Sequence, residues 1–472
     1  MGSEEALRRP RTPYCWRGGM LLRFRVANYA SLRDEQELSL VALDDHDDLA
    51  VRRPIDDDLS VLPAAAVYGG NASGKSNLLE AMHFMQEAVC HSHLGWGPEA
   101  AIPRNSFRFD DDIRRKPSEF CVDIAVDGVH YEYGFAVDDE VVRSEWLYCF
   151  VKRQRRVRRV LFERSGPEWT SIRFGGHLKG RKRAIAEFVR PNSLYLSVAA
   201  ANNHPQLTKI YGWFSNQMIY IDAGVPVPHL PYTLHLAATP DRSAVLDLLN
   251  YADLGISDIR QEPLVLDNEL RDRFMAVLKV VDPDRTPDLG FAVEAATRVD
   301  FIHRVRGKEY ALPLENESSG TRSWFALLGP ILEALAHGMV LVVDELNAFL
   351  HPLLVSELVN LFQDPTYNRQ GAQLVFNTHD SFLLSPLSKA RLRRDQVWLT
   401  DRDEDGATTL RPLTDYRVRD GLDSVFRGYL LGRYRGIPIF DEGLLEELIL
   451  RHTHMHGDPP RKGSETEAGE LT

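Results

Sequence analysis

The residues best suited to chemistry lie in a glycine-rich segment that joins an apolar run to a helical pattern. Residues 69–76 read GGNASGKS, so that four residues separate Gly69 from Gly74, Lys75 and Ser76. This spacing is typical of a phosphate-binding loop, in which backbone amides curl around phosphate oxygens at the start of a helix. Lys75 would contact the terminal phosphates of a nucleotide, and Ser76 would be a ligand of Mg²⁺. The predicted nucleotide-binding residues are Gly69, Gly70, Asn71, Ala72, Ser73, Gly74, Lys75, Ser76 and Asn77.

Two further apolar runs also end in polar residues. The run MVLVVDE at 339–345 ends in Asp344 and Glu345, and AQLVFNTHD at 372–380 contains His379. Parallel strands of an α/β sheet carry catalytic groups at the carboxyl edge, so we expect these side chains near the glycine-rich loop. Asp344 is predicted to hold the magnesium ion through water, and Glu345 to polarise the attacking water. His379 is predicted to touch the terminal phosphate or that water.

A small polar cluster, ENESSGTR at 315–322, precedes the helical pattern of SWFALLGPILEAL. Locally it is a helix cap, and the amides at a helix start also make an anion site. The order of glycine-rich loop, ESSGT, DE and TH resembles that of ABC-type ATPases. The resemblance implies ATP and Mg²⁺ as cofactors and a homodimer, or a higher oligomer, held by an ATP sandwich. It also implies that the signature residues Ser318, Ser319 and Gly320 bind the ATP of the opposite subunit.

Two other family elements are less regular in this chain. Residues 347–351 stand in the place of the D-loop, which in the family crosses the dimer interface; the alternative is a plain turn before a helix begun near Pro352. No glutamine stands where a Q-loop is expected, and residues 106–109, SFRF, could take that part. The sequence therefore leaves the Q-loop and the residues that stack on adenine open.

Longer stretches sharpen the resemblance. RFRVANYASLRDEQELSL, DELNAFLHPLLVSELVNLF and RRDQVWLTDRDEDGATTL together are similar to the prokaryotic AAA-type ATPases of the abortive-infection, AbiL-like group, related to the ATPases of OLD-type and PARIS-type phage-defence systems. This implies a sensor or regulatory subunit of an anti-phage system that controls a separate effector, for which a TOPRIM-like nuclease is one candidate. The alternative is an SMC-like DNA-repair or recombination ATPase that acts directly on DNA. A third interpretation is a nucleotide-dependent scaffold that scarcely turns over.

The expected fold is α/β: an ABC-type ATPase core with a mainly parallel sheet, an antiparallel β subdomain and an inserted helical lid or arm. Residues 1–19 lack periodicity and are expected to form a flexible extension. Residues 20–165 would hold the first half of the core and the antiparallel lobe, where the DG of EFCVDIAVDGVHYEYGFAVDD indicates a hairpin. The remaining predicted parts are a mainly helical insertion at 166–312, the second half of the core at 313–440, and a C-terminal helix with a disordered tail at 441–472.

Composition and charge bound the class of protein. The 472 residues carry a net charge of −12 and 44% hydrophobic residues, as expected of a globular chain with two or three domains. Scattered cysteines, no signal peptide and no bilayer-length apolar run favour a reduced, cytoplasmic protein without membrane contact. Two basic patches, at 152–159 and 179–183, could contact nucleic acid, although a charge run on an exposed hairpin is usually a solvated face. Neither patch interleaves aromatic residues that could stack on bases.

Overall fold

The structure is a computed structural model of the whole chain. It describes residues 19–43, 60–152, 156–222, 230–240, 242–263, 297–417, 425–436, 443 and 448–450. Most of the predicted N-terminal extension at 1–19 and of the predicted C-terminal helix and tail at 441–472 lies outside the described residues. So do Arg153 and Arg155 of the first basic patch.

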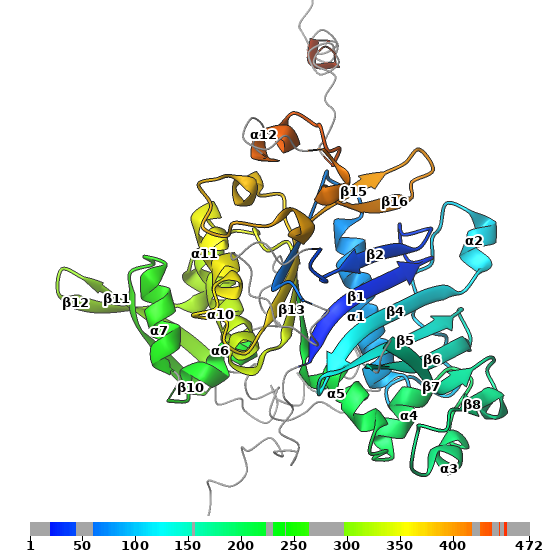
Figure 1. Cartoon of the computed structure of the whole chain (residues 1–472). Coiled ribbons are helices and arrows are strands. Elements are labelled where there is room, and N and C mark those ends of the chain that lie inside the picture. Colours follow the sequence, from blue (N-terminus) through cyan, green and yellow to red (C-terminus); the bar gives the residue numbers. More distant parts are fainter. Residues whose placement is uncertain are drawn as a thin grey trace, which may run out of the picture.

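A six-stranded sheet carries the predicted chemistry, with strand order β16-β15-β3-β14-β13-β9. Neighbouring strands are parallel except for the antiparallel hairpin of β15 and β16. Its strands are β3 (Ala64–Gly69), β9 (Met218–Asp222), β13 (Val340–Asp344), β14 (Gln373–Asn377), β15 (Val397–Arg402) and β16 (Thr408–Pro412). β3, β13 and β14 are buried along their whole length, which is why their sequences are apolar without alternation. The three predicted strands that end in polar residues therefore lie side by side and end at one edge of the sheet (Figure 1).

A seven-stranded antiparallel sheet forms the second layer, with strand order β2-β1-β4-β5-β6-β7-β8. The predicted DG hairpin is confirmed: Asp127 and Gly128 join β4 to β5 with φ of 52° and 75°, as a tight two-residue turn requires. The strands are β1 (Met20–Ala27), β2 (Gln36–Ser39), β4 (Ser118–Val126), β5 (Val129–Val137), β6 (Val142–Lys152), β7 (Arg156–Arg164) and β8 (Ile172–Phe174).

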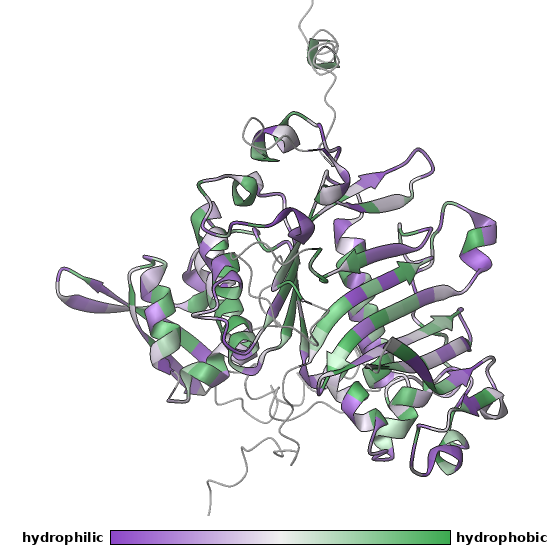
Figure 2. Ribbon diagram, in the orientation of Figure 1, coloured by the Kyte–Doolittle hydropathy of each residue, from purple (hydrophilic) through white to green (hydrophobic). Residues whose placement is uncertain are grey.

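Helix α1 (Lys75–His91) joins the two sheets into one core. Its apolar side chains belong to a buried cluster that takes Val67 and Val342 from the six-stranded sheet and Phe120 and Tyr133 from the antiparallel sheet. A second buried cluster covers the other face of the six-stranded sheet with α10 (Ser319–His337) and α11 (Pro352–Gln363). Figure 2 shows apolar residues concentrated along these strands and helices. The predicted α/β fold with a mainly parallel sheet and an antiparallel β lobe is confirmed.

The segment 166–312, predicted as a mainly helical insertion, contributes to the core instead of standing apart. β9 pairs with β13 at the edge of the six-stranded sheet, and β8 pairs with β7. Its helices are α3 (Lys182–Ala186), α4 (Tyr195–Ala201), α5 (Leu207–Asn216), α6 (Leu230–Ala237) and α7 (Arg242–Tyr251). The boundaries of the five predicted parts stay predictions.

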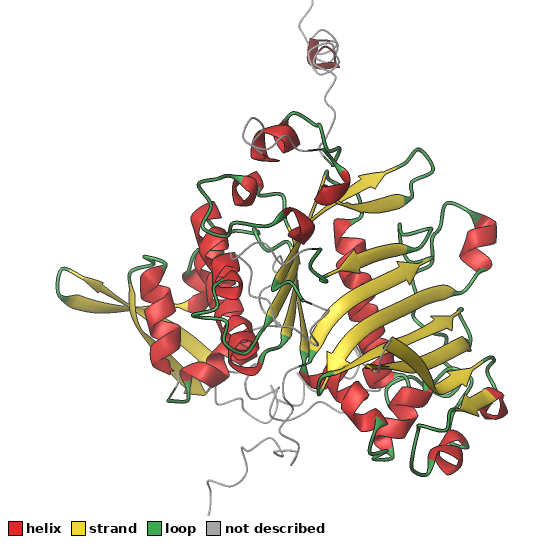
Figure 3. Ribbon diagram, in the orientation of Figure 1, coloured by secondary structure: helices red, strands yellow, loops and turns green. Residues whose placement is uncertain are grey.

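A third sheet is also formed mainly by this segment. β10 (Ile256–Pro263), β11 (Thr297–Val305) and β12 (Lys308–Pro313) pair in that order and project beside α7 (Figure 3). In the part of the chain that the structure describes, two further short α-helices are α2 (Asp111–Arg115) and α12 (Val425–Leu430). Within the described residues, no helix combines the length and the apolarity needed to cross a membrane.

Candidate functional site

The glycine-rich loop spans the gap between β3 and α1. Gly74 precedes the first residue of α1 with φ of 95°, a left-handed conformation that glycine adopts readily. No side chain among the described residues caps α1, which leaves its first backbone N–H groups open to an anion. Lys75 is buried, and its Nζ donates to the carbonyl oxygens of Gly69 at 2.9 Å and Gly70 at 2.8 Å. The ammonium group therefore lies inside the loop.

The β15–β16 hairpin packs against this loop and holds it by hydrogen bonds. Ser73 Oγ and Thr400 Oγ1 are 2.6 Å apart, and Thr408 Oγ1 donates to the carbonyl oxygen of Ser73 at 2.9 Å. A Cβ atom at Gly69 would lie 2.1 Å from Thr400 Oγ1. Gly69 is thus required because β15 approaches the loop so closely.

Asn377, the last residue of β14, connects the predicted magnesium ligands. Its Nδ2 donates to the carboxylate of Asp344 and, at 3.4 Å, to Ser76 Oγ. Its Oδ1 accepts the backbone N–H of Glu345. Glu345 has φ of 55°, a left-handed conformation that is uncommon for a residue with a side chain. One amide therefore fixes three predicted site residues, Ser76, Asp344 and Glu345, relative to one another.

The surroundings of Asp344 suit a hydrated magnesium ion. Burial raises the pKa of Asp344, and the negative charges of Asp222 and Glu345 add to that rise, while its hydrogen bonds with Ser76 and Asn377 oppose it. A divalent cation would favour the ionised carboxylate, and carboxylate and hydroxyl oxygens are the ligands that Mg²⁺ prefers. The residues present therefore fit the ion, with Ser76 and Asp344 as the groups that would hold it.

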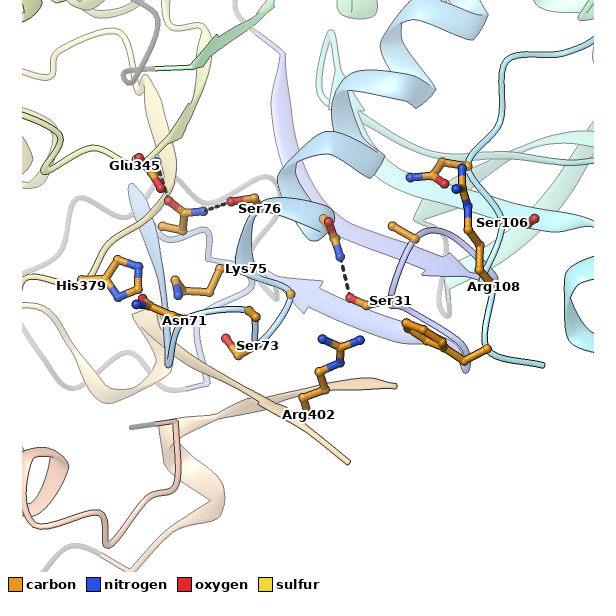
Figure 4. A pocket seen from close by; sticks show the side chains of 17 residues that line it. Ser31, Asn71, Ser73, Lys75, Ser76, Ser106, Arg108, Glu345, His379 and Arg402 are labelled. Carbon is orange, nitrogen blue, oxygen red and sulfur yellow. Dashed lines mark hydrogen bonds between the residues drawn. The ribbon is translucent and has the colours of Figure 1, made fainter. Parts of the chain in front are cut away.

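A cavity of about 750 Å³ opens over the loop. In Figure 4 Glu345, His379 and Asn71 lie on one side of Lys75, and Ser31, Ser106 and Arg108 lie on the other. The guanidinium carbon of Arg402 is 5.3 Å from the centroid of the Phe109 ring. The lining residues are Ala30, Ser31, Asn71, Ala72, Ser73, Gly74, Lys75, Ser76, Asn77, Asn105, Ser106, Arg108, Phe109, Glu345, Asn377, His379 and Arg402.

His379 lies at the wall of this cavity, next to the loop that follows Glu345. Desolvation and the positive charge of Lys75 lower the pKa of His379, so its imidazole is neutral at pH 7. Asn347 Oδ1 accepts the backbone N–H of His379 at 3.2 Å and the hydroxyl of Thr378 at 2.9 Å. The segment predicted as a D-loop is therefore tied to the segment that carries the histidine.

The predicted signature residues do not line the cavity. Ser318 caps α10, because its Oγ accepts the backbone N–H of Thr321 at 3.1 Å. Ser318 and Ser319 are exposed. A Cβ atom at Gly320 would lie 2.8 Å from the carbonyl oxygen of Phe349, so the signature packs against the predicted D-loop. Within one chain, the structure brings the loop, Asp344, Glu345 and His379 together and leaves the signature facing outward.

Several residues at the site were missed by sequence reasoning. Asn377 had a usable signal, because LVFN ends a buried strand just as LVVD does. Ser31, Thr400 and Thr408 had none, because their contacts depend on strand pairing between distant segments. Of the residues predicted to replace a Q-loop, Ser106, Arg108 and Phe109 line the cavity.

One family model matches this chain, and solved structures align with it at low identity. No curated protein matches it. The SMC head domain from Thermotoga maritima aligns with a TM-score of 0.35 and 11% identity over 84% of this chain and 99% of that one. An Smc head with an extended coiled coil, bound to the C-terminal domain of ScpA from Pyrococcus furiosus, aligns with a TM-score of 0.35 and 10% identity. That alignment covers 84% of this chain and 97% of the Smc chain. Residues 64–385 match the family model described as "AAA domain, putative AbiEii toxin, Type IV TA system". Because this match covers more than half of the sequence, the chain belongs to that family of AAA domains.

Proposed function

We propose that this chain is an ABC-type ATPase that binds ATP with Mg²⁺ in the cavity over the glycine-rich loop and hydrolyses it. The observation that carries the proposal is the contact of Asn377 with Asp344, Ser76 and Glu345 beside the buried Lys75. This arrangement gathers a phosphate-binding cation, two groups suited to magnesium and a carboxylate for the attacking water at one place. A strand that merely ended in solvated polar residues would not need the hydrogen bonds that Asn377 makes to these three residues.

The residues divide the work as follows. The loop amides and Lys75 bind the phosphates, after Lys75 leaves the carbonyl oxygens that it contacts now. Ser76 and Asp344 would hold magnesium, which would neutralise negative charge on the phosphate oxygens. Glu345 accepts a proton from the attacking water, and the neutral His379 orients that water or the terminal phosphate. Phe109 and Arg402 offer a flat surface for the base.

The active unit in this proposal is a homodimer or a higher oligomer. Ser318, Ser319 and Gly320 would complete the site of an opposite subunit, because Ser318 and Ser319 are exposed in their own chain. The backbone N–H groups at the start of α10 suit a phosphate. The neighbouring Phe349 and Leu353 are 59% and 57% exposed, as apolar side chains are at surfaces that a partner covers.

We further propose that the ATPase is the sensor or regulatory subunit of an anti-phage, abortive-infection system. The role rests on the sequence resemblance to the ATPases of phage-defence systems. The family description names a putative toxin of a type IV toxin–antitoxin system. ATP-driven closure of the dimer would control a separate effector protein, for which a TOPRIM-like nuclease is one candidate. A culture whose cells carry the gene and its neighbouring genes should survive phage challenge. The Lys75→Ala variant should abolish that protection. Equal protection by Lys75→Ala would contradict the role.

Three variants test the enzymatic proposal. Lys75→Ala should abolish ATP binding, because it removes the cation from the loop. Glu345→Gln should bind ATP but turn it over at least about a hundredfold more slowly, because the base is lost. Ser318→Arg should bind ATP and lose turnover, because it blocks the opposite subunit's site. Lys308→Ala, an exposed lysine on β12, is the matched control and should change neither measurement. Undiminished turnover by Glu345→Gln would remove Glu345 from the mechanism.

A further inference from the structure

Tyr68 ties the strand before the glycine-rich loop to the segment that carries His379. It is the next-to-last residue of β3, and its side chain is fully buried. Its hydroxyl donates to the carbonyl oxygen of Asp380, the residue after His379, at 3.2 Å. Burial raises the pKa of Tyr68 well above its ordinary value, and the negative charge of Asp380 adds to the rise. The hydroxyl therefore keeps its proton and remains a donor.

The backbone around His379 is held on both sides. Asn347 Oδ1 accepts the backbone N–H of His379 itself, and the Tyr68 hydroxyl holds the next carbonyl group. The side chain of Asp380 caps the 3₁₀ turn Ser381–Leu384 that follows. A side chain reaches only the positions that its backbone and its few rotamers allow. The two anchors therefore limit where the imidazole of His379 can lie.

Helix α12 packs on this connection from a distant part of the sequence. The ring of Tyr429 meets that of Tyr68 edge to face, with centroids 5.5 Å apart and an angle of 68° between the planes. Tyr429 is itself buried, and α12 also contacts the turn Ser381–Leu384. Aromatic pairs of this geometry are stabilising beyond the apolar area that they bury. Tyr429 therefore helps to fix the ring that carries the Tyr68 hydroxyl.

The chain that follows α12 returns to β15 and to the start of the glycine-rich loop (Figure 1). A Cβ atom at Gly436 would lie 3.6 Å from the Cα of Gly69 and 3.5 Å from the carbonyl oxygen of Thr400. The hydroxyl of Tyr429 donates to the carbonyl oxygen of Gly436 at 3.3 Å. The segment Val425–Gly436 thus lies against the loop and, through Tyr429, against the connection to the histidine.

We propose that Tyr68 is a positioning residue for His379, and that the docking of α12 on Tyr68 thereby sets the rate of ATP hydrolysis. This inference rests on the proposed ATPase function and goes beyond it by giving the segment Val425–Gly436 a part in turnover. A misplacement of about 1 Å in a group that contacts the reacting atoms is enough to slow a reaction strongly. ATP binding depends on the loop amides and Lys75, so it should survive when Tyr68 loses only its hydroxyl.

The test is a double-mutant cycle on the full chain, read by single-turnover ATP hydrolysis with the enzyme in excess. Tyr68→Phe keeps the ring and removes the hydroxyl. It should lower the hydrolysis rate about five- to tenfold and leave the Kd for ATP, measured by titration calorimetry, within about twofold of wild type. In a His379→Ala background, Tyr68→Phe should cause no further loss, because the residue through which it acts is absent. A merely structural tyrosine would cause the same fold-change in both backgrounds.

Variants of Tyr429 test the part that α12 plays. Tyr429→Leu removes the ring that packs on Tyr68 and should lower the hydrolysis rate at least about threefold, again only when His379 is present. Tyr429→Phe keeps that ring and should retain most of the wild-type rate, because it loses only the hydrogen bond to Gly436.

Tyr133→Phe is the matched control. Tyr133 is as deeply buried as Tyr68, and its hydroxyl donates to Glu145 at 3.0 Å within the antiparallel lobe. Tyr133→Phe should unfold at a lower temperature than wild type in calorimetry and keep the wild-type hydrolysis rate.

Several results would overturn the inference and leave the ATPase standing. They are a wild-type rate in Tyr68→Phe or Tyr429→Leu, the same fold-loss from Tyr68→Phe with and without His379, and an equal loss of rate in Tyr133→Phe. Absence of turnover in the wild-type protein would overturn the proposed ATPase function and this inference together.

Discussion

Asn377 ends β14 beside the place where Asp344 ends β13, since the register pairs Val343 with Phe376. Its amide group donates to Asp344 and Ser76 and accepts from the backbone of Glu345. An amide can do all of this at once because it has both donors and an acceptor. Asn377 is therefore a positioning residue for both the magnesium ligands and the base.

Asn377→Ala should lower kcat by about 10- to 100-fold, the usual effect of losing a partner of metal ligands. The KM for ATP should change only a few-fold, because the loop and Lys75 are untouched. Steady-state kinetics over a magnesium titration should show a raised magnesium requirement. Asn250→Ala, at the exposed end of α7, is the control and should behave as wild type. A wild-type magnesium dependence in Asn377→Ala would show that the network does not position the ligands.

Lys75 makes nucleotide binding depend on pH. Burial lowers the pKa of Lys75 to about 8, and the charges of Glu345 and Asp344 oppose that shift. The ammonium form binds phosphate, and it is lost as pH rises through 8. The Kd for ATP should therefore increase about tenfold between pH 7 and pH 9. Titration calorimetry across this range checks it, and Lys75→Met, which also lacks the ammonium group, should show no measurable ATP binding at either pH.

The sequence allowed much of the loop to be predicted, because its geometry follows from local residue types. Gly74 at φ of 95° and Lys75 at the first turn of α1 are consequences of the local motif GGNASGKS. The support given by Thr400 and Thr408 could not be predicted, because it arises from pairing of β15 with β3, more than 300 residues away in sequence.

At the scale of elements, α10 contains a proline, and a residue of another helix satisfies the backbone groups that the proline leaves without helical partners. Pro330 lacks an N–H group, so the carbonyl oxygen of Ala326, four residues earlier, has no helical donor. Thr233 Oγ1 of α6 donates to the carbonyl oxygen of Phe325 at 2.7 Å, with a longer contact to the carbonyl oxygen of Ala326 at 3.4 Å. The same Oγ1 accepts the backbone N–H of Gly329 at 2.8 Å. α6 is therefore docked on α10 by a buried hydroxyl.

Thr233→Val should lower the free energy of unfolding by about 1–3 kcal/mol, because it leaves buried backbone groups unsatisfied while it keeps the side-chain volume. Chemical denaturation followed by tryptophan fluorescence measures this change. Thr170→Val, on an exposed turn, should stay within about 0.5 kcal/mol of wild type. Equal stability of the two variants would contradict the docking role of Thr233.

The helix SWFALLGPILEAL was predictable because its apolar periodicity survives the proline. The edge strand β9 was not, because a five-residue run with only partial burial carries too little pattern to separate it from its helical neighbours. The same limit applies to Tyr148 of β6, whose ring contact with Arg158 of the first basic patch depends on the β6–β7 register.

At the scale of the molecule, the proposed dimer depends on the surface around the signature. Phe349 is exposed beside Gly320 and has φ of 62°, a conformation that aspartate tolerates better than phenylalanine. Phe349→Asp should therefore fold, yet dimerise at least about tenfold more weakly when combined with Glu345→Gln and ATP.

Sedimentation velocity over a range of protein concentrations measures this dimerisation. Leu94→Asp, at an exposed residue in the turn that follows α1, is the control and should dimerise normally. An ATP-bound Glu345→Gln protein that remains monomeric at every concentration would contradict the composite site altogether.

The left-handed backbone at Glu345 has a consequence for thermal stability. Alanine ordinarily stabilises a chain more than glycine, but a positive φ reverses that order by about 1 kcal/mol. Calorimetry should thus find that Glu345→Gly unfolds at a higher temperature than Glu345→Ala, although neither hydrolyses ATP. The reverse order would show that the turn relaxes without strain. If the predicted order is found, the carboxylate is held at one fixed point at a cost in thermal stability. Glycine, which gives the higher unfolding temperature at position 345, cannot catalyse.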